Sequence, residues 1–349
     1  MSFLHLGLRY SRVIRLPSIF GAICPRVHIF DGAVTERYRG TYIAKEHPDW
    51  VITMSQSDSG LYNLGLPQAR EFMTRYVIAA IKEYGIDVLR IDYNINPEAY
   101  WKQLDDKDPS RRGLEEIHYL EGFYQMWDDI RKAYPHLSID NCASGGRRID
   151  LETVSRSIPL WRTDGTIGPL MRLDFNQAAL QNQVMTAGLS RYVPFSTSGE
   201  MGASPYLFRS GFNAGISFAE DVRPAAYPRD ELRQAIAEGK RLRKYFFGSF
   251  YPLNEVTTNP EDWCVLQYHR PTEQDGMVMA FRRNLSPYND YAAILNEIAP
   301  EGKYEVSFYS SYGLPKIVTM AGEELQHLKL KIADVPGSVV VEYKKVPPR

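Results

Sequence analysis

Two segments of this 349-residue chain place an acidic residue where an apolar run stops. The first, residues 88–94 (VLRIDYN), contains Asp92, and the second, residues 137–164, ends at Asp164. The β-branched and apolar residues that open each segment predict strands buried on both faces. In parallel α/β proteins, sites are built at the carboxyl ends of such strands. Two carboxylates in that place suit glycoside cleavage, in which one acts as nucleophile and the other as proton donor.

The neighbours of each acid indicate a role for it. Arg90 and Asp92 are two residues apart, so we expect them on the same face of a strand. A nearby cation lowers the pKa of a carboxyl group and keeps a nucleophile ionised. Asp164 follows Trp161, and a large apolar ring raises the pKa of a carboxyl group, which favours a proton donor. On the residues alone, an aspartate that ends a strand is more often a helix N-cap or a salt-bridge partner.

The run Cys142–Gly146 (CASGG), between the two acids, consists only of small residues. Backbone built from such residues can approach a ligand closely and offer amide donors. A tight strand-to-helix turn with Ser144 as its N-cap would account for the same residues. Both interpretations stay open from the sequence.

Composition narrows the class of protein. A net charge of −1 argues against nucleic-acid or other polyanion binding. Cys24, Cys142 and Cys264 are widely separated and odd in number, so we expect neither disulfides nor a zinc site. No run of about 18 uncharged apolar residues occurs, so no membrane partner is expected. Residues 1–30 do not match a secretory signal, which favours a cytoplasmic location.

The order of apolar patterns predicts an α/β fold. Helical spacing predicts helices over 67–84 and 114–133, next to strands over 88–92 and 137–141. The alternation continues with helices over 148–157, 173–188 and 230–247 and strands near 160–162, 192–195 and 215–218. Repeated strand–helix units over some 200 residues favour a (β/α)8 barrel of the triosephosphate isomerase (TIM) type. The lack of a GxGxxG motif after a strand disfavours a dinucleotide-binding domain.

The pattern of apolar residues changes after residue 255. Short alternating runs separated by turn signals, from 263 to 343, predict a small antiparallel β domain. We therefore expect an atypical N-terminal segment over 1–39, a TIM-barrel catalytic domain over 40–255 and an antiparallel β domain over 256–349.

The motifs around the two acids resemble those of glycoside hydrolase family 36, the bacterial α-galactosidase or melibiase family. The family's K-x-D-x-N motif is similar to Arg90, Asp92 and Asn94, with Arg in place of Lys. Its N-C-A-S-G-G run is intact at Asn141–Gly146, and its W-x-S-D element is similar to Trp161–Asp164. Supporting matches lie at 46–50 (EHPDW), 63–65 and 251–253 (YPL), so the resemblance covers about residues 40–345.

The resemblance implies a retaining α-galactosidase that removes terminal α-linked galactose from oligosaccharides or glycoconjugates. It implies that Asp92 is the nucleophile and Asp164 the general acid/base, with no cofactor. The substrate-binding residues that it implies are Arg90, Asn94, Cys142, Gly145 and Trp161. The alternatives are an α-N-acetylgalactosaminidase of the same family and an inactive, truncated sugar-binding remnant.

The sequence departs from the family upstream of residue 40. The family's early D-D-G-W pair and its W-F-E-P-E strand have no counterpart there. We therefore expect an N-terminally truncated enzyme whose barrel is incomplete at its N-terminal strands. Because such a barrel leaves parallel strand edges unpaired, we expect weak or no activity, and either homo-oligomers or poor solubility.

Overall fold

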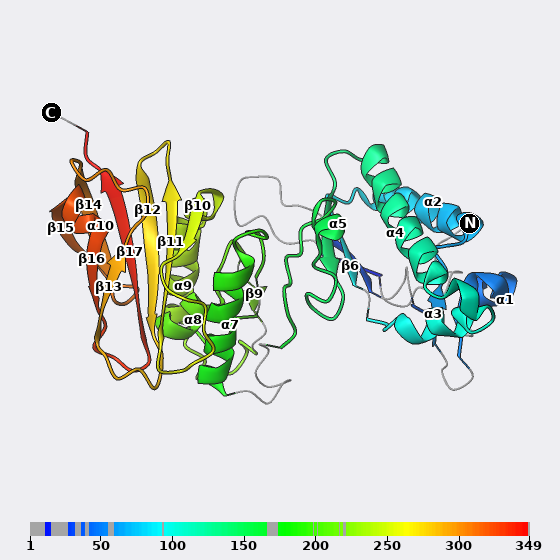
Figure 1. Cartoon of the computed structure of the whole chain (residues 1–349), viewed down its shortest axis with the longest axis horizontal. Helices are drawn as coiled ribbons and strands as arrows, with labels where there is room; N and C mark the ends of the chain where they lie inside the picture. The colour runs from blue at the N-terminus through cyan, green and yellow to red at the C-terminus, as the bar shows by residue number, and fades with distance from the viewer. Residues whose placement is uncertain are drawn as a thin grey trace. The chain divides into compact units, whose positions relative to one another are not determined.

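The chain divides into two compact units, Met1–Trp161 and Arg162–Arg349. The computed structural model is shown in Figure 1. It describes residues 11–14, 27–31, 36–38, 42–54, 59–92, 94–165, 174–197, 199–200, 202–215, 217–218 and 221–347. Much of the expected N-terminal segment, including Cys24, lies outside the described residues.

A mixed four-stranded sheet forms the centre of the first unit, in the order β1–β2–β6–β7. Its strands are β1 (Ser11–Ile14), β2 (Val27–Asp31), β6 (Val88–Asp92) and β7 (Ser138–Cys142). β2, β6 and β7 run parallel, whereas β1 is antiparallel to β2. Beyond β7, Ile158 makes a single parallel bridge with Asp140. The described strands of this unit thus form a sheet that does not close into a ring.

Helices of the first unit cover this sheet with amphipathic faces. They are α1 (Tyr42–Glu46), α2 (Pro67–Tyr84), α3 (Glu98–Asp105), α4 (Leu114–Ala133) and α5 (Leu151–Val154), with short 3-10 turns η2 (Pro48–Trp50) and η3 (Pro109–Arg111). Leu89 and Ile91 of β6 lie in one core cluster with Trp127 of α4. α2 begins at Pro67, which needs no amide partner there, and ends at Gly85 in the left-handed region (φ 60°).

The segment that resembles the family motif EHPDW runs from the last residue of α1 through η2 and ends directly before β4. It leads into a small antiparallel sheet made of β3 (Glu36–Tyr38), β5 (Ser59–Tyr62) and β4 (Val51–Thr53). The rings of His47 and Trp50 stack with their centroids 3.7 Å apart, and Trp50 also packs on Phe72 of α2. These contacts fix the chain that enters α2.

The second unit has three layers. Helices α7 (Phe175–Leu189), α8 (Pro205–Gly211) and α9 (Arg229–Leu242), followed by the 3-10 turn η4 (Arg243–Phe247), pack on one face of an antiparallel sheet (Figure 1). That sheet has the order β10–β11–β12–β17–β14–β15. Its other face packs on the pair β13–β16 and on α10 (Gly322–Gln326). The strands are β10 (Ser249–Pro252), β11 (Trp263–Arg270), β12 (Asp275–Arg282), β13 (Asp290–Ile294), β14 (Lys303–Tyr309), β15 (Lys316–Ala321), β16 (His327–Lys331) and β17 (Gly337–Lys345).

Alternation along the central strands explains this layering. In β11, Leu266 and Tyr268 face the helices, whereas Val265 faces the β13–β16 pair. Because successive side chains of a strand point to opposite faces, a strand covered on both sides is apolar throughout. A two-residue parallel pair, β8 (Gly199–Glu200) with β9 (Ser217–Phe218), completes the described strands of this unit.

Several elements agree with the sequence analysis and others differ. The helices over 67–84 and 114–133, the strand over 88–92 and the C-terminal antiparallel sheet are confirmed. The helix predicted over 148–157 is only the short α5, and the strand predicted near 160–162 is replaced by isolated bridge residues at Ile158, Trp161 and Thr163. The prediction of a strand over 192–195 was wrong, because the amides of Tyr192 and Val193 turn back to the carbonyl of Leu189. Among the described residues, no helix is long and apolar enough to cross a membrane.

A buried ion pair joins two helices of the second unit and gives a test of its stability. Nε and Nη2 of Arg209 on α8 donate to Oε1 and Oε2 of Glu238 on α9 at 2.7 and 2.9 Å. Both side chains are almost completely buried, and Arg209 also donates to the carbonyl oxygens of Ser338 and Ser311. We expect Glu238→Gln to lower the free energy of unfolding by about 3–5 kcal/mol, because it leaves a buried guanidinium without its counter-charge.

The measurement is urea unfolding followed by circular dichroism. The matched control is Arg233→Ala, which removes an ion pair with Asp230 on the exposed face of the same helix. Exposed pairs contribute about 1 kcal/mol or less, so the control should barely change the free energy. Equal small losses for the two variants would contradict the role given to the buried pair.

Candidate active site

Strand β6 divides its side chains between the core and the candidate site. Leu89 and Ile91 are completely buried, whereas Arg90 and Asp92 alternate with them and are half-buried. The alternation places Arg90 and Asp92 together on the other face of the strand, as the two-residue spacing predicts. The parallel register places Arg90 beside Asp140 and Asp92 beside Cys142 of β7.

The ion pair of Arg90 is made across the strands, with Asp140. Nη1 of Arg90 lies 2.5 Å from Oδ2 of Asp140. Oδ1 of Asp140 accepts a hydrogen bond from the amide of Leu160 at 3.0 Å. Burial raises the pKa of Asp140, although Arg90 and the Leu160 amide oppose that shift. Burial opposes the charge of Arg90 as well, but Asp140 is the chief cause that raises the pKa of this guanidinium.

The small-residue turn after β7 reaches back to the end of β6. The amide of Ser144 donates to Oδ1 of Asp92 and to Oδ1 of Asn94, both at 3.2 Å. The hydroxyl of Ser144 also donates to Oδ1 of Asn94, at 2.8 Å. Ser144 and Gly145 both have left-handed backbone, with φ of 48° and 84°. This conformation aims the amide of residue 144 at the carboxylate, so the turn supplies a donor to the candidate nucleophile.

Cys142 places a thiol beside the same carboxylate. Its side chain is buried, and burial raises its pKa to about 12. Arg90 opposes this shift, whereas the charge of Asp92 and a hydrogen bond between the thiol and Asp92 add to it. The thiol is therefore neutral at ordinary pH and acts as a weak donor.

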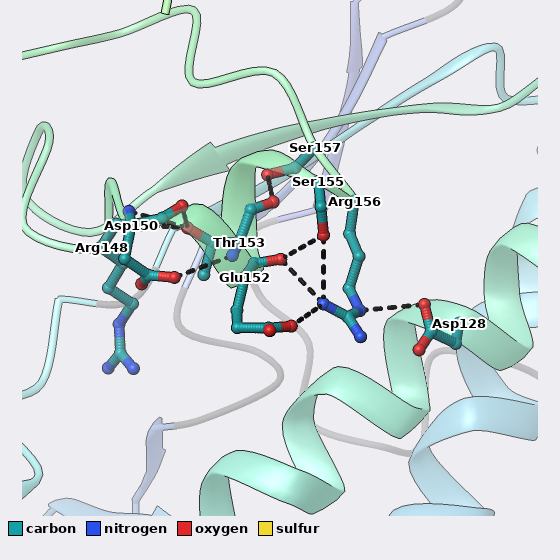
Figure 2. Close-up of polar contacts among 8 residues, drawn as sticks. All are labelled: Asp128, Arg148, Asp150, Glu152, Thr153, Ser155, Arg156 and Ser157. Carbon is teal, nitrogen blue, oxygen red and sulfur yellow. Dashed lines mark hydrogen bonds and ion pairs between the residues drawn. The ribbon is translucent and has the colours of Figure 1, made fainter. Parts of the chain in front are cut away.

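The chain that follows the turn is anchored to its strand and to the next helix. The carbonyl of Arg148 accepts hydrogen bonds from Nδ2 of Asn141 and from the hydroxyl of Thr153, at 3.0 and 2.5 Å. Asp150 caps α5 by accepting from the amide of Thr153, as Figure 2 shows. The N-cap of this helix is therefore Asp150, and the interpretation of Ser144 as its N-cap was wrong.

Helix α5 is in turn held on α4 by Arg156. Its guanidinium contacts Oδ1 of Asp128 on α4 at 2.9 Å and Oε2 of Glu152 on α5 at 2.6 Å (Figure 2). The same guanidinium lies over the ring of Tyr124, 4.9 Å from its centroid. These contacts fix α5 on α4, and they do not involve Asp92 or the groups that donate to it.

The second candidate acid lies at the start of the second unit. Trp161, which is half-buried, ends the first unit, and Asp164 belongs to the second. The backbone two residues before Asp164 is anchored, because the amide of Arg162 donates to the carbonyl of Thr197 at 2.9 Å. The hydroxyl of Thr163 accepts from the amide of Gly165 at 2.9 Å, and this short turn presents Asp164 in a half-buried position.

Within the described ranges, no three His, Cys, Asp or Glu side chains gather in a way that could hold a metal ion. The side chains of β6, β7 and the residues that follow them instead form a hydrogen-bonding site: two carboxylates (Asp92 and Asp140), one guanidinium (Arg90), one thiol (Cys142) and one amide oxygen (Asn94). The sequence analysis missed Asp140 and the donor role of Ser144. The only signal for Asp140 is its position two residues before Cys142, which repeats the spacing of Arg90 and Asp92.

The fold is similar to that of solved family 36 glycoside hydrolases. The Melibiase family model matches residues 38–199 of this chain. An α-galactosidase from Escherichia coli is 27% identical over 154 residues, which is 42% of this chain and 19% of the relative. A probable α-galactosidase C from Aspergillus flavus is 28% identical over 292 residues, which is 79% of this chain and 36% of the relative.

Solved structures share the fold. A family 36 α-galactosidase from Geobacillus stearothermophilus in complex with raffinose superposes with a TM-score of 0.68 at 16% identity, covering 90% of this chain and 44% of that one. An α-galactosidase from Lactobacillus brevis gives a TM-score of 0.69 at 17% identity, covering 93% and 44%. The chain therefore spans less than half the length of these curated and solved relatives.

The buried thiols give a test of the site's electrostatics. Burial raises the pKa of Cys142 to about 12 and that of Cys264 to about 11. At pH 8 a free cysteine with a pKa of about 8.5 is roughly one-quarter thiolate, so we expect Cys142 to react with iodoacetamide about a thousandfold more slowly. The measurement is peptide mass spectrometry of the alkylated protein, with the urea-unfolded protein as control. Alkylation of Cys142 in the folded protein at the rate of the unfolded control would contradict the placement of its thiol.

Proposed function

We propose that this chain carries the chemistry of a retaining α-galactosidase, which removes terminal α-linked galactose from oligosaccharides or glycoconjugates. The observation that supports this most is the carboxylate of Asp92, held at the end of a parallel strand by the amide of Ser144 within the family's small-residue run. A nucleophilic carboxylate has to be ionised and fixed in one orientation. The donor from Ser144 favours the fixed orientation.

In this proposal Asp92 attacks the anomeric carbon and forms a glycosyl-enzyme. Asp164 protonates the departing oxygen in the first step and removes a proton from the attacking water in the second. Retaining enzymes hold the two carboxyl groups about 5–5.5 Å apart, so we expect that separation in the active protein. The scaffold proposed for this is a TIM barrel, as the strand–helix units imply.

The sugar-binding role is assigned to donors and acceptors around Asp92. Arg90 and the Cys142–Gly145 turn would contact sugar hydroxyl groups, and the amide of Asn94 is placed beside them by Ser144. Trp161 would offer a ring face to the apolar side of the sugar. The Geobacillus stearothermophilus relatives were solved with raffinose and with stachyose, so terminal galactosides of that kind are the substrates to try first.

The first test is hydrolysis of 4-nitrophenyl α-galactoside by residues 1–349, with 4-nitrophenyl α-N-acetylgalactosaminide in parallel. Release of nitrophenol from the galactoside alone would support the proposal. Preference for the acetamido sugar would replace it by the α-N-acetylgalactosaminidase alternative. Galactose binding without hydrolysis of either compound would favour the sugar-binding remnant.

The role of Asp92 predicts a chemical rescue. Asp92→Gly should abolish hydrolysis of the nitrophenyl galactoside, because no group remains to form the glycosyl-enzyme. Azide should restore part of the rate by entering the space of the lost carboxylate, and it should yield β-galactosyl azide. The product is identified by nuclear magnetic resonance, and the unaltered protein with azide is the control. An active Asp92→Gly variant without azide would contradict the assignment.

The role of Asp164 predicts a dependence on the leaving group. Asp164→Ala should slow the hydrolysis of melibiose or raffinose by roughly 100-fold or more, because the leaving groups of these sugars need protonation. The glycosylation rate of a dinitrophenyl galactoside should fall far less, because its dinitrophenolate leaves without being protonated. The measurement is kcat/KM across leaving groups of graded acidity. Equal losses for all of them would exclude an acid role for Asp164.

A further inference from the structure

Asp140 is a buried carboxylate between the strands of the candidate site. It is only 5% exposed, and both of its oxygens are occupied. Oδ2 contacts Nη1 of Arg90 at 2.5 Å, and Oδ1 accepts from the amide of Leu160 at 3.0 Å. An isolated carboxylate is costly to bury, so both partners are needed to keep the charged form in place.

These two contacts join three segments that the proposed chemistry uses. Arg90 lies on β6 two residues before Asp92, and Asp140 lies on β7 two residues before Cys142. Leu160 directly precedes Trp161. Backbone bonds between Ile158 and β7, at 2.8 and 3.2 Å, hold the same segment against the strand.

The guanidinium of Arg90 has donors to spare. Within the described part of the chain, its only hydrogen bond is the one from Nη1 to Asp140. Its side chain is 20% exposed, so the remaining N–H groups are accessible from the face that carries Asp92. A long side chain with several rotatable bonds needs a fixed partner if its free donors are to keep one direction.

We propose that Asp140 is a positioning residue of the active site, which fixes the guanidinium of Arg90 beside Asp92 and the peptide that leads into Trp161. The inference rests on the proposed galactosidase function and adds a residue to it. Asp140 does not touch the substrate in this proposal. It acts through Arg90, whose free N–H groups bind sugar hydroxyl groups.

The test is a double-mutant cycle on kcat/KM for 4-nitrophenyl α-galactoside, with Asp140→Asn, Arg90→Gln and the double variant. The side-chain amide introduced by Asp140→Asn is uncharged, and its NH2 group puts a donor in place of one of the two oxygens that accept from Arg90 and Leu160. We expect Asp140→Asn to lower kcat/KM by 10- to 100-fold, mostly through KM, and to have little further effect when Arg90 is already replaced by Gln. Such non-additivity is the signature of two residues that act as a unit.

Asp128→Asn is the matched control, because Asp128 also pairs with an arginine of the first unit, Arg156, away from Asp92 (Figure 2). It should keep the kcat/KM of the unaltered protein. Unchanged kcat/KM in Asp140→Asn, or losses that simply multiply with those of Arg90→Gln, would overturn the inference. If Asp140→Asn does not fold, Asp140→Glu keeps the charge but displaces it by one methylene, and normal kcat/KM in that variant would overturn it as well.

Failure of the proposed function is separable from failure of this inference. Absence of hydrolysis by the unaltered protein would contradict the function. The same cycle is then measured on urea unfolding and on galactose binding by calorimetry. Coupling between residues 90 and 140 in both measurements would support the positioning role, and coupling in unfolding alone, with galactose binding unchanged, would overturn it.

Discussion

The candidate site depends on the parallel register between β6 and β7. That register sets Arg90 against Asp140 and Asp92 against Cys142, so a half-buried cation meets a buried anion and a carboxylate meets a thiol. A shift by one residue would turn Leu89 and Ile91 toward the site and Arg90 into the core, which no local adjustment could compensate. The apolar face of β6 therefore fixes the chemistry of its polar face.

Much of the fold could be predicted because the signals are local. α2 lies between Pro67 and Gly85, and α4 carries acids in its first turn and bases in its last, so both helices have ends that a sequence displays. The prediction of a strand over 192–195 was wrong because the amides of Tyr192 and Val193 donate to the carbonyl of Leu189 at the end of α7. Apolar alternation in the sequence does not reveal such a contact. The shortness of α5 has a similar cause, since its Asp150 cap starts the helix later than the apolar pattern suggests.

In the candidate site, the face of the strand that carries Arg90 and Asp92 was predictable, whereas the contacts between the strands were not. Spacing placed Arg90 and Asp92 on one face, but the ion pair of Arg90 is with Asp140 on another strand. Helices α3 and α4 lie between these strands in the chain. The sequence of neither strand indicates the register in which the two strands pair. The turn at Ser144 was ambiguous for another reason, because a helix cap and a ligand-facing amide use the same small residues. Only the backbone angles separate the two.

Those angles have a consequence for how the site is maintained. Ser144 has a left-handed backbone conformation that glycine adopts at lower cost, but its hydroxyl group adds a second hydrogen bond to Asn94 beside the one from its amide. Glycine at this position would relieve local strain and keep the amide donor to Asp92, but it would lose the hydroxyl bond to Asn94. Variants selected for thermal stability alone would therefore tend to hold Asn94 less firmly, while the amide bond to Asp92 remains.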